Sequence, residues 1–302
     1  MKNFEYTAPQ TLREAVRLLA EKGSGARVLA GGTDLIVQMR INRHRPDRVV
    51  DVKNVPEVNE LAMRPRKGLV IGAAVPCHRI YDDSEISERY PGLVDAAAII
   101  GGIQIQGRAT FGGNLCNSSP AADTTPILLA HGATAEITGT GGKRRVAVED
   151  FCTGPGTNVL TDGELLVSLV VPPDRRNSGS HYLRFIPRNE MDIAVVGAGA
   201  YVELGRRGKV FKSARIALGA VAPVPLYARE AGEGLAGKPV SEETIAEAAE
   251  AAKGIARPIS DMRGPAEYRT HLVGVLVKRA LNGAVARARG QFVANAVQEA
   301  AG

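Results

Sequence analysis

Two glycine-rich segments limit what this chain can fold into and bind. Residues 30–34 read Ala-Gly-Gly-Thr-Asp, and residues 110–123 read Thr-Phe-Gly-Gly-Asn-Leu-Cys-Asn-Ser-Ser-Pro-Ala-Ala-Asp. Glycine leaves the backbone uncovered, so a glycine-rich turn presents a concave run of N–H groups that suits anionic oxygens, usually those of a diphosphate. We therefore expect two loops that hold one large ligand, such as a dinucleotide, from two sides.

Neither segment fits the common phosphate motifs G-x-G-x-x-G or G-x-x-x-x-G-K-[ST]. A single Gly-Gly pair is more often an ordinary turn, but the dense Asn, Ser and Asp residues of the second segment need backbone or ligand partners. Asp123 is placed to accept hydrogen bonds from ribose hydroxyls. The residues expected to offer N–H groups to phosphate are Gly31, Gly32, Thr33, Gly112, Gly113 and Asn114.

The hydrophobic periodicity predicts an α+β protein in two pieces. A capping box at residues 11–14 opens a helix that ends at Gly23, and strands at 26–30 and 49–52 complete a small β-α-β unit. The stretch 172–180 is expected to be the linker between the pieces. The other predicted helices are 78–89, 91–101, 125–131, 240–254 and 271–286, and the other predicted strands are 69–73, 133–138, 164–171, 193–204 and 210–221.

The chain has 38 Lys and Arg against 32 Asp and Glu, which gives a net charge of +6. Much of this excess lies in residues 39–48, where no stacking aromatic residues or recognition helix accompany it. Nucleic acid is therefore not an expected partner. The basic stretch is either a solvated face or an interface with an acidic partner or ligand.

Cysteine content and hydropathy exclude several other classes of protein. The three cysteines, Cys77, Cys116 and Cys152, are too few and too widely spaced for a disulfide framework or a four-thiolate cluster. No histidines have metal-ligand spacing, so no metal site is expected. No window reaches about 18 uninterrupted apolar residues, and the N-terminus lacks the apolar region of a signal peptide. We expect a cytoplasmic protein without a membrane span.

In their order and separation, the two glycine-rich segments resemble those of the FAD-binding subunits of the molybdenum hydroxylases. This is the xanthine dehydrogenase and aerobic carbon monoxide dehydrogenase family, in its separate medium-chain form. Residues 30–35 resemble the first pyrophosphate segment of that family, and residues 112–124 resemble the second. A third match, at residues 256–269, is similar to the helix entry of the family's C-terminal domain.

The resemblance implies a fold and a set of cofactor contacts. Residues 1–176 would form a PCMH-type FAD-binding domain of two α/β subdomains, 1–55 and 56–176, and residues 177–302 a domain of antiparallel sheet plus helices. The implied FAD contacts are Val28, Leu29, Ala30, Gly31, Gly32, Thr33, Asp34, Leu35, Ile100, Ala109, Thr110, Gly112, Gly113, Asn114, Asn117, Ala122, Asp123, Leu166 and Arg184. Among these, the resemblance places Ile100 near the isoalloxazine ring, Leu166 near the adenine and Arg184 as a basic residue touching FAD. A loop at residues 188–193 matches one that lies near the flavin in some relatives.

The function that the resemblance implies is electron transfer by an FAD-carrying subunit. Electrons would arrive from a small subunit with 2Fe–2S clusters, and the substrate would react on a large molybdopterin subunit, in an assembly expected to be a dimer of heterotrimers. No general base and no His or Cys for a covalent flavin link stand out, so no catalytic residue is assigned to this chain. Two alternatives remain open: an autonomous FAD-dependent oxidoreductase with its own substrate site, and a nucleotide-binding scaffold without a redox role. The terminal acceptor is also open among NAD, oxygen, quinone and ferredoxin.

Overall fold

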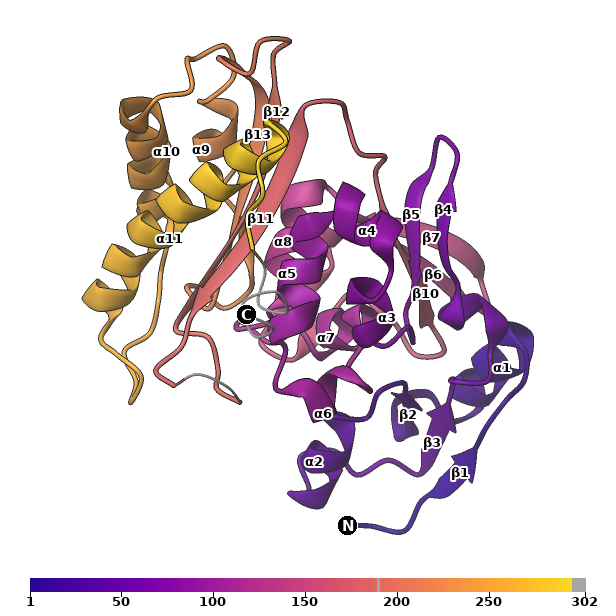
Figure 1. Cartoon of the computed structure of the whole chain (residues 1–302). Helices are drawn as coiled ribbons and strands as arrows, with labels where there is room; N and C mark the ends of the chain where they lie inside the picture. Colours follow the sequence, from indigo (N-terminus) through magenta and orange to yellow (C-terminus); the bar gives the residue numbers. More distant parts are fainter. Residues whose placement is uncertain (189–190, 295–302) are drawn as a thin grey trace.

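The computed structural model describes residues 1–188 and 191–294 (Figure 1). Three cores of buried apolar side chains accompany three main β-sheets along the chain. The N-terminal sheet lies at one end of the molecule, the C-terminal sheet and its helices lie at the other, and the central sheet and helices lie between them (Figure 1).

The N-terminal sheet is parallel and has the strand order β1-β3-β2. Its strands are β1 (Glu5–Thr7), β2 (Ala26–Leu29) and β3 (Arg48–Asp51), and its helices are α1 (Leu12–Lys22) and α2 (Leu35–Arg40). The predicted β-α-β unit is confirmed. Helix α1 begins where the Thr11 side chain accepts the Glu14 N–H, and it ends at Gly23, whose φ is 51°. Strand β1 was not predicted, because it has only three residues and these are largely exposed.

The central sheet is antiparallel throughout, with the order β4-β5-β10-β6-β7. Its strands are β4 (Leu61–Arg64), β5 (Gly68–Gly72), β6 (Thr134–Gly139), β7 (Gly142–Ala147) and β10 (Leu165–Val171), and a hairpin of β8 (Cys152–Gly154) and β9 (Thr157–Asn158) stands beside it. The inner strands β5, β6 and β10 are confirmed at their predicted places. The edge strands β4 and β7 were missed because they carry partly exposed, charged residues that show little apolar alternation.

Six helices belong to this central part of the chain, and the prediction of a single helix over residues 78–89 is wrong. They are α3 (His78–Tyr81), α4 (Ser84–Arg89), α5 (Pro91–Ile99), α6 (Ile103–Gln106), α7 (Phe111–Asn117) and α8 (Thr124–His131). Residues 78–89 were expected to form one helix but form two. The chain is extended at Asp83, with φ −86° and ψ 115°, and the Asp83 side chain accepts the Ile86 N–H to cap α4.

The C-terminal sheet has four antiparallel strands in the order β11-β12-β13-β14. These are β11 (Ser178–Phe185), β12 (Val196–Leu204), β13 (Phe211–Gly219) and β14 (Leu226–Tyr227), followed by α9 (Arg229–Glu233), α10 (Glu242–Ile255) and α11 (Ala266–Ala288). The predicted β12–β13 pair and both long helices are confirmed. The predicted linker 172–180 is too long, because β11 already begins at Ser178 and pairs with β12 along its whole length.

Helices from both pieces of the chain cover the C-terminal sheet. Helix α11 packs on β11 and β12 from one side, and α5 and α8 pack on the sheet from the other (Figure 1). On β12, Ala198 and Ala200 belong to the C-terminal core, while a Cβ at Gly199 would lie 3.0 Å from the Pro126 carbonyl oxygen of α8. Tyr182 of β11 belongs to the central core. The two pieces therefore share a buried contact surface rather than a flexible joint.

Two helical glycines predict opposite changes in stability. Gly254 of α10 is exposed and a Cβ there would meet nothing within 4 Å, so Gly254→Ala should raise the free energy of unfolding by about 0.5–1 kcal/mol. Gly283 of α11 is buried, and a Cβ there would lie 2.3 Å from His181 Cδ2, so Gly283→Ala should lower it by about 1–3 kcal/mol. Urea unfolding followed by circular dichroism measures both. Equal stability of the two variants would contradict the packing of α11 on β11.

Candidate cofactor site

The first glycine-rich segment is a tight turn that joins β2 to α2. Gly32 has a φ of +78°, a left-handed conformation that glycine adopts without strain. Helix α2 starts directly after it, where the Ile36 N–H donates to the Gly32 carbonyl oxygen at 3.1 Å. Among the described residues, no protein acceptor meets the backbone N–H groups of Gly31, Gly32 and Thr33. The turn therefore has the open donors that an anion requires.

The glycine-containing part of the second segment is a helix: residues 111–117 form α7 and only residues 118–123 are a loop, so the prediction of a loop is wrong for residues 111–117. Thr110 caps α7: its hydroxyl accepts the Gly113 N–H at 2.8 Å, and its carbonyl oxygen accepts the Asn114 N–H at 2.9 Å. Two of the three amides expected to face phosphate on this side are thus already bonded within the chain. The segment is helical despite its two glycines because a helix places Phe111 and Leu115, four residues apart, on one face, where both are fully buried.

The two segments nevertheless lie side by side. A Cβ at Gly31 would stand 2.1 Å from the Arg108 carbonyl oxygen and 3.2 Å from Ala109 Cα, so the turn touches the backbone that leads into α7. At the far end of that helix, Gln38 Nε2 of α2 donates to Asn117 Oδ1 at 2.9 Å. The predicted meeting of two glycine-rich segments, 80 residues apart, is thus present in the structure.

Helix α7 is fastened to its surroundings by small residues and amide side chains. A Cβ at Gly112 would lie 2.5 Å from Ala73 Cα, so the helix rests directly on the backbone that leaves β5. Asn114 Oδ1 accepts both the Thr124 hydroxyl, at 2.7 Å, and the Thr124 N–H, at 3.2 Å. These contacts align the start of α8 with α7, which brings Asp123 to the same region.

Asp123 is buried between the two pieces of the chain. Its Oδ1 accepts the Tyr182 hydroxyl at 3.0 Å, and its Oδ2 accepts Arg184 Nη1 at 2.7 Å. Arg184 also donates through Nη2 to the Ile99 carbonyl oxygen at the end of α5. Burial raises the pKa of Asp123 to about 6, although the positive charge of Arg184 and the Tyr182 hydroxyl act to lower it. The carboxylate predicted to hold a ribose thus also joins α8 to β11.

Sequence reasoning missed Tyr182 as a partner of Asp123. Ser180, Tyr182 and Arg184 alternate along β11, so they point to the same face of the strand. This alternation could have indicated a strand with the three side chains on one face. It was missed because the start of the segment was predicted to be part of a linker. Tyr182 is 2% exposed, so its hydroxyl has to find a partner inside the protein.

The structure places the remaining predicted residues in two groups. Those around the first turn are Val28 and Leu29 in β2, Ala30 and Asp34 in the turn and Leu35 at the start of α2. Ile100, Ala109, Thr110 and Ala122 are buried beside α7 and α8. Leu166 differs from these residues, because it is 2% exposed within the central core, where it pairs with Ile137.

Some predictions concern groups outside this cluster. Cys77, Cys116 and Cys152 are free thiols, and burial raises the pKa of Cys116 to about 12. Over residues 1–188 and 191–294, no three His, Cys, Asp or Glu side chains gather to hold a metal, and no helix is long and apolar enough to cross a bilayer. Of the predicted loop at 188–193, residues 189–190 lie outside the described residues.

Two family profiles together match most of the chain. The profile of the FAD binding domain in molybdopterin dehydrogenase matches residues 2–174. The profile of the CO dehydrogenase flavoprotein C-terminal domain matches residues 181–284.

Individual relatives match over nearly their full length. The chain is 33% identical to the xanthine dehydrogenase FAD-binding subunit of Escherichia coli O157:H7, over 95% of this chain and 98% of the relative. It is 35% identical to the carbon monoxide dehydrogenase medium chain of Hydrogenophaga pseudoflava, over 94% and 98%. Among solved structures, a chain of the cyanide-inactivated Cu,Mo-CO dehydrogenase superposes with a TM-score of 0.90 at 33% identity, covering 95% of this chain and 99% of that one. A chain of quinoline 2-oxidoreductase from Pseudomonas putida 86 gives 0.87 at 31% identity, covering 95% and 99%.

Proposed function

The chain belongs to the family of FAD-binding subunits of the molybdenum hydroxylases, of the xanthine dehydrogenase and carbon monoxide dehydrogenase type, and from this we propose where it holds FAD and with which subunits it works. It is an oxidoreductase subunit, its cofactor is FAD, and its role is electron transfer. FAD, when bound, supplies the uptake and release of electrons. The task of this chain is to bind the cofactor, orient it and keep water from it.

One observation supports the position of the FAD site: the open amides of Gly31, Gly32 and Thr33 lie in a turn whose backbone touches the residues leading into α7. A diphosphate carries anionic oxygens that accept such N–H groups directly. A Cβ at Gly31 would lie 2.1 Å from the Arg108 carbonyl oxygen, so no residue larger than glycine fits between the turn and Arg108. The residues present therefore suit the diphosphate of FAD.

We assign the cofactor contacts to the predicted residues, with two amendments from the geometry. The first concerns α7, where Gly113 and Asn114 would touch the cofactor through their surfaces, because their N–H groups are bonded to Thr110. The second concerns Asp123, which would meet a ribose only through lone pairs that Tyr182 and Arg184 leave free. Val28 to Leu35, Ile100, Ala109, Thr110, Gly112, Asn117, Ala122, Leu166 and Arg184 keep their predicted roles.

The partners follow from the names of the relatives, which are FAD-binding subunits or medium chains of larger enzymes. We propose that this chain works with an iron–sulfur small subunit and a molybdopterin large subunit, assembled as a dimer of heterotrimers in the cytoplasm. The proposed domains are residues 1–176, with subdomains 1–55 and 56–176, and residues 177–302. In this arrangement substrate chemistry takes place on the large subunit.

Purification of the chain together with the proteins of its operon tests the proposal. We expect the complex to contain one FAD per copy of this chain, measured by releasing the flavin and comparing its absorbance with the protein concentration. A complex that is colourless and takes up no FAD on titration would contradict the assignment of the cofactor. Bleaching of the flavin by a substrate added to the isolated chain would instead favour an autonomous oxidoreductase.

A further inference from the structure

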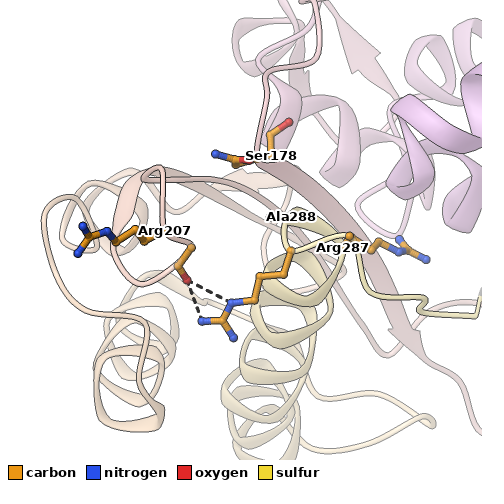
Figure 2. A pocket seen from close by; sticks show the side chains of 8 residues that line it. Ser178, Arg207, Arg287 and Ala288 are labelled. Carbon is orange, nitrogen blue, oxygen red and sulfur yellow. Dashed lines mark hydrogen bonds between the residues drawn. The ribbon is translucent and has the colours of Figure 1, made fainter.

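A basic surface lies at one end of the C-terminal sheet. Three stretches meet there: the turn before β11, the hairpin between β12 and β13, and the residues that follow α11. They enclose an open cavity of about 490 Å³, lined by Asn177, Ser178, Arg207, Gly208, Arg287 and Arg289 among others (Figure 2). Among the described residues, none that lines this cavity is acidic.

Six cationic side chains belong to these stretches and are all exposed: Arg175, Arg176, Arg206, Arg207, Lys209 and Arg289. Over the described part of the chain, none of the six forms an ion pair, whereas Arg89, Lys212, Arg215 and Arg229 each do. The acidic residues nearest in sequence are already bound, Asp174 by Arg89 and Glu203 by Lys212. We call these six residues the basic surface.

Two arginines at the cavity hold it in shape. Arg287 is bound to both oxygens of Asp95, at 2.6 and 2.9 Å, and points away from the cavity, so it is a structural residue and not a free cation (Figure 2). Arg289 donates through Nε and Nη2 to the Gly208 carbonyl oxygen, at 3.2 and 2.9 Å, which fixes the hairpin against the end of α11. A guanidinium has five N–H donors, so Arg289 keeps three for a ligand.

Like charges gathered on one surface repel one another unless a partner neutralises them. Five of the six are arginines, whose planar guanidinium binds a carboxylate through two parallel hydrogen bonds and is enriched at protein interfaces. In the described part of these stretches a single aromatic residue, Phe292, is available for stacking, whereas single-stranded nucleic acid is bound by aromatic side chains that stack successive bases. The surface therefore fits a carboxylate-bearing protein segment.

The basic surface lies at the opposite end of the molecule from the turn with the open amides (Figure 1). The β12–β13 end of the sheet lies at the top of the view in Figure 1, and α2, beside the open amides, lies near the bottom. We propose that the basic surface docks a carboxylate-rich segment of another subunit of the same complex. This inference rests on the proposed function, because that function supplies the partner subunits.

The test compares two triple charge reversals in the coexpressed complex. One is Arg176→Glu, Arg206→Glu and Arg207→Glu, on the basic surface. The matched control is Arg13→Glu, Lys143→Glu and Arg279→Glu, which changes the charge equally at exposed residues that form no ion pairs in the described part of the chain. Analytical ultracentrifugation measures the dissociation constant between this chain and its partners at low and high salt.

We expect the triple variant of the basic surface to weaken association with the partner subunits about 100-fold at low salt and to remove most of the salt dependence of this association. The control triple variant should associate within twofold of the wild type. The neutral variant Arg206→Gln and Arg207→Gln should show a smaller loss in the same direction. Association of all variants within twofold of the wild type would overturn the proposal. So would binding of inorganic tripolyphosphate that depends on these arginines while assembly is unchanged, since the occupant would then be a small polyanion. Failure of the wild-type chain to associate with any partner would contradict the proposed function instead.

Discussion

Replacing Gly31 by alanine is expected to weaken FAD binding by the complex strongly. The new Cβ would stand 2.1 Å from the Arg108 carbonyl oxygen, and backbone on both sides leaves no flexible side chain to give way. The turn must therefore move away from α7, which displaces the open amides of Gly31, Gly32 and Thr33. A shift of this kind costs about 1–3 kcal/mol, so we expect FAD affinity to fall about 5- to 150-fold.

The matched control for this variant is Gly141→Ala. Gly141 lies in the exposed turn between β6 and β7, where a Cβ would meet nothing within 4 Å. FAD titration followed by flavin fluorescence should give this variant the affinity of the wild type. If Gly31→Ala also bound FAD as the wild type does, the close approach of the two segments would not form the FAD site.

Elements with a strong local signal could be predicted from the sequence. The Thr11 cap, Gly23 and the apolar spacing between them define α1. Strands β5 and β10 are runs of apolar residues typical of the inside of a sheet, and β6 alternates the buried Ala135 and Ile137 with partly exposed residues. Strand β11 has no such signal. Its first residues, Ser178, Gly179 and Ser180, are small and show no apolar pattern. Gly179 and Ser180 are buried because α11 and α5 pack closely on them: a Cβ at Gly179 would lie 2.3 Å from the Ala284 carbonyl oxygen, and the Gly92 N–H donates to Ser180 Oγ. These are tertiary contacts between residues about 100 positions apart, which no local pattern reports.

The candidate site also has parts that the local sequence predicts and parts that depend on tertiary contacts. The open turn at Gly31 to Thr33 follows from glycine chemistry alone, and the order of the two segments pointed to the family. That residues 111–117 would be helical depended on burial of Phe111 and Leu115, and their environment comes from β10 and α8. The pairing of Asp123 with Tyr182 and Arg184 depended on β11 lying against α8, so it became visible only in the fold.

The Asp123–Arg184 pair yields the second large prediction. Both side chains are almost fully buried, with exposed fractions of 10% and 6%. Arg184→Met would leave the carboxylate buried with only the Tyr182 hydroxyl as partner, which should lower the free energy of unfolding by about 3–5 kcal/mol at neutral pH. The control is Arg64→Met, which removes the surface pair with Glu60, where the side chains are 55% and 34% exposed, and should cost less than about 1 kcal/mol.

The pH dependence identifies the buried carboxylate as the cause. In the wild type the pKa of Asp123 is raised from its ordinary 3.8 to about 6. The contribution of this carboxyl group to the free energy of unfolding is therefore fully present below pH 3.8 and is lost as the pH rises through about 6. Without the Arg184 charge the pKa of Asp123 rises further, so this loss continues to higher pH. The stability deficit of Arg184→Met should thus be larger at pH 8 than at pH 5, measured by urea unfolding with circular dichroism.

The double variant Asp123→Asn, Arg184→Met separates charge from packing. Asparagine keeps the size of the side chain and an acceptor for Tyr182 but cannot ionise, so no buried charge is left unpaired. We expect the double variant to be more stable than Arg184→Met at pH 8, and its deficit to be the same at pH 5 and pH 8. Equal deficits of Arg184→Met at the two pH values would show that Arg184 stabilises the contact between α8 and β11 by packing, and that its charge is not needed to hold the two pieces of the chain together beside the FAD site.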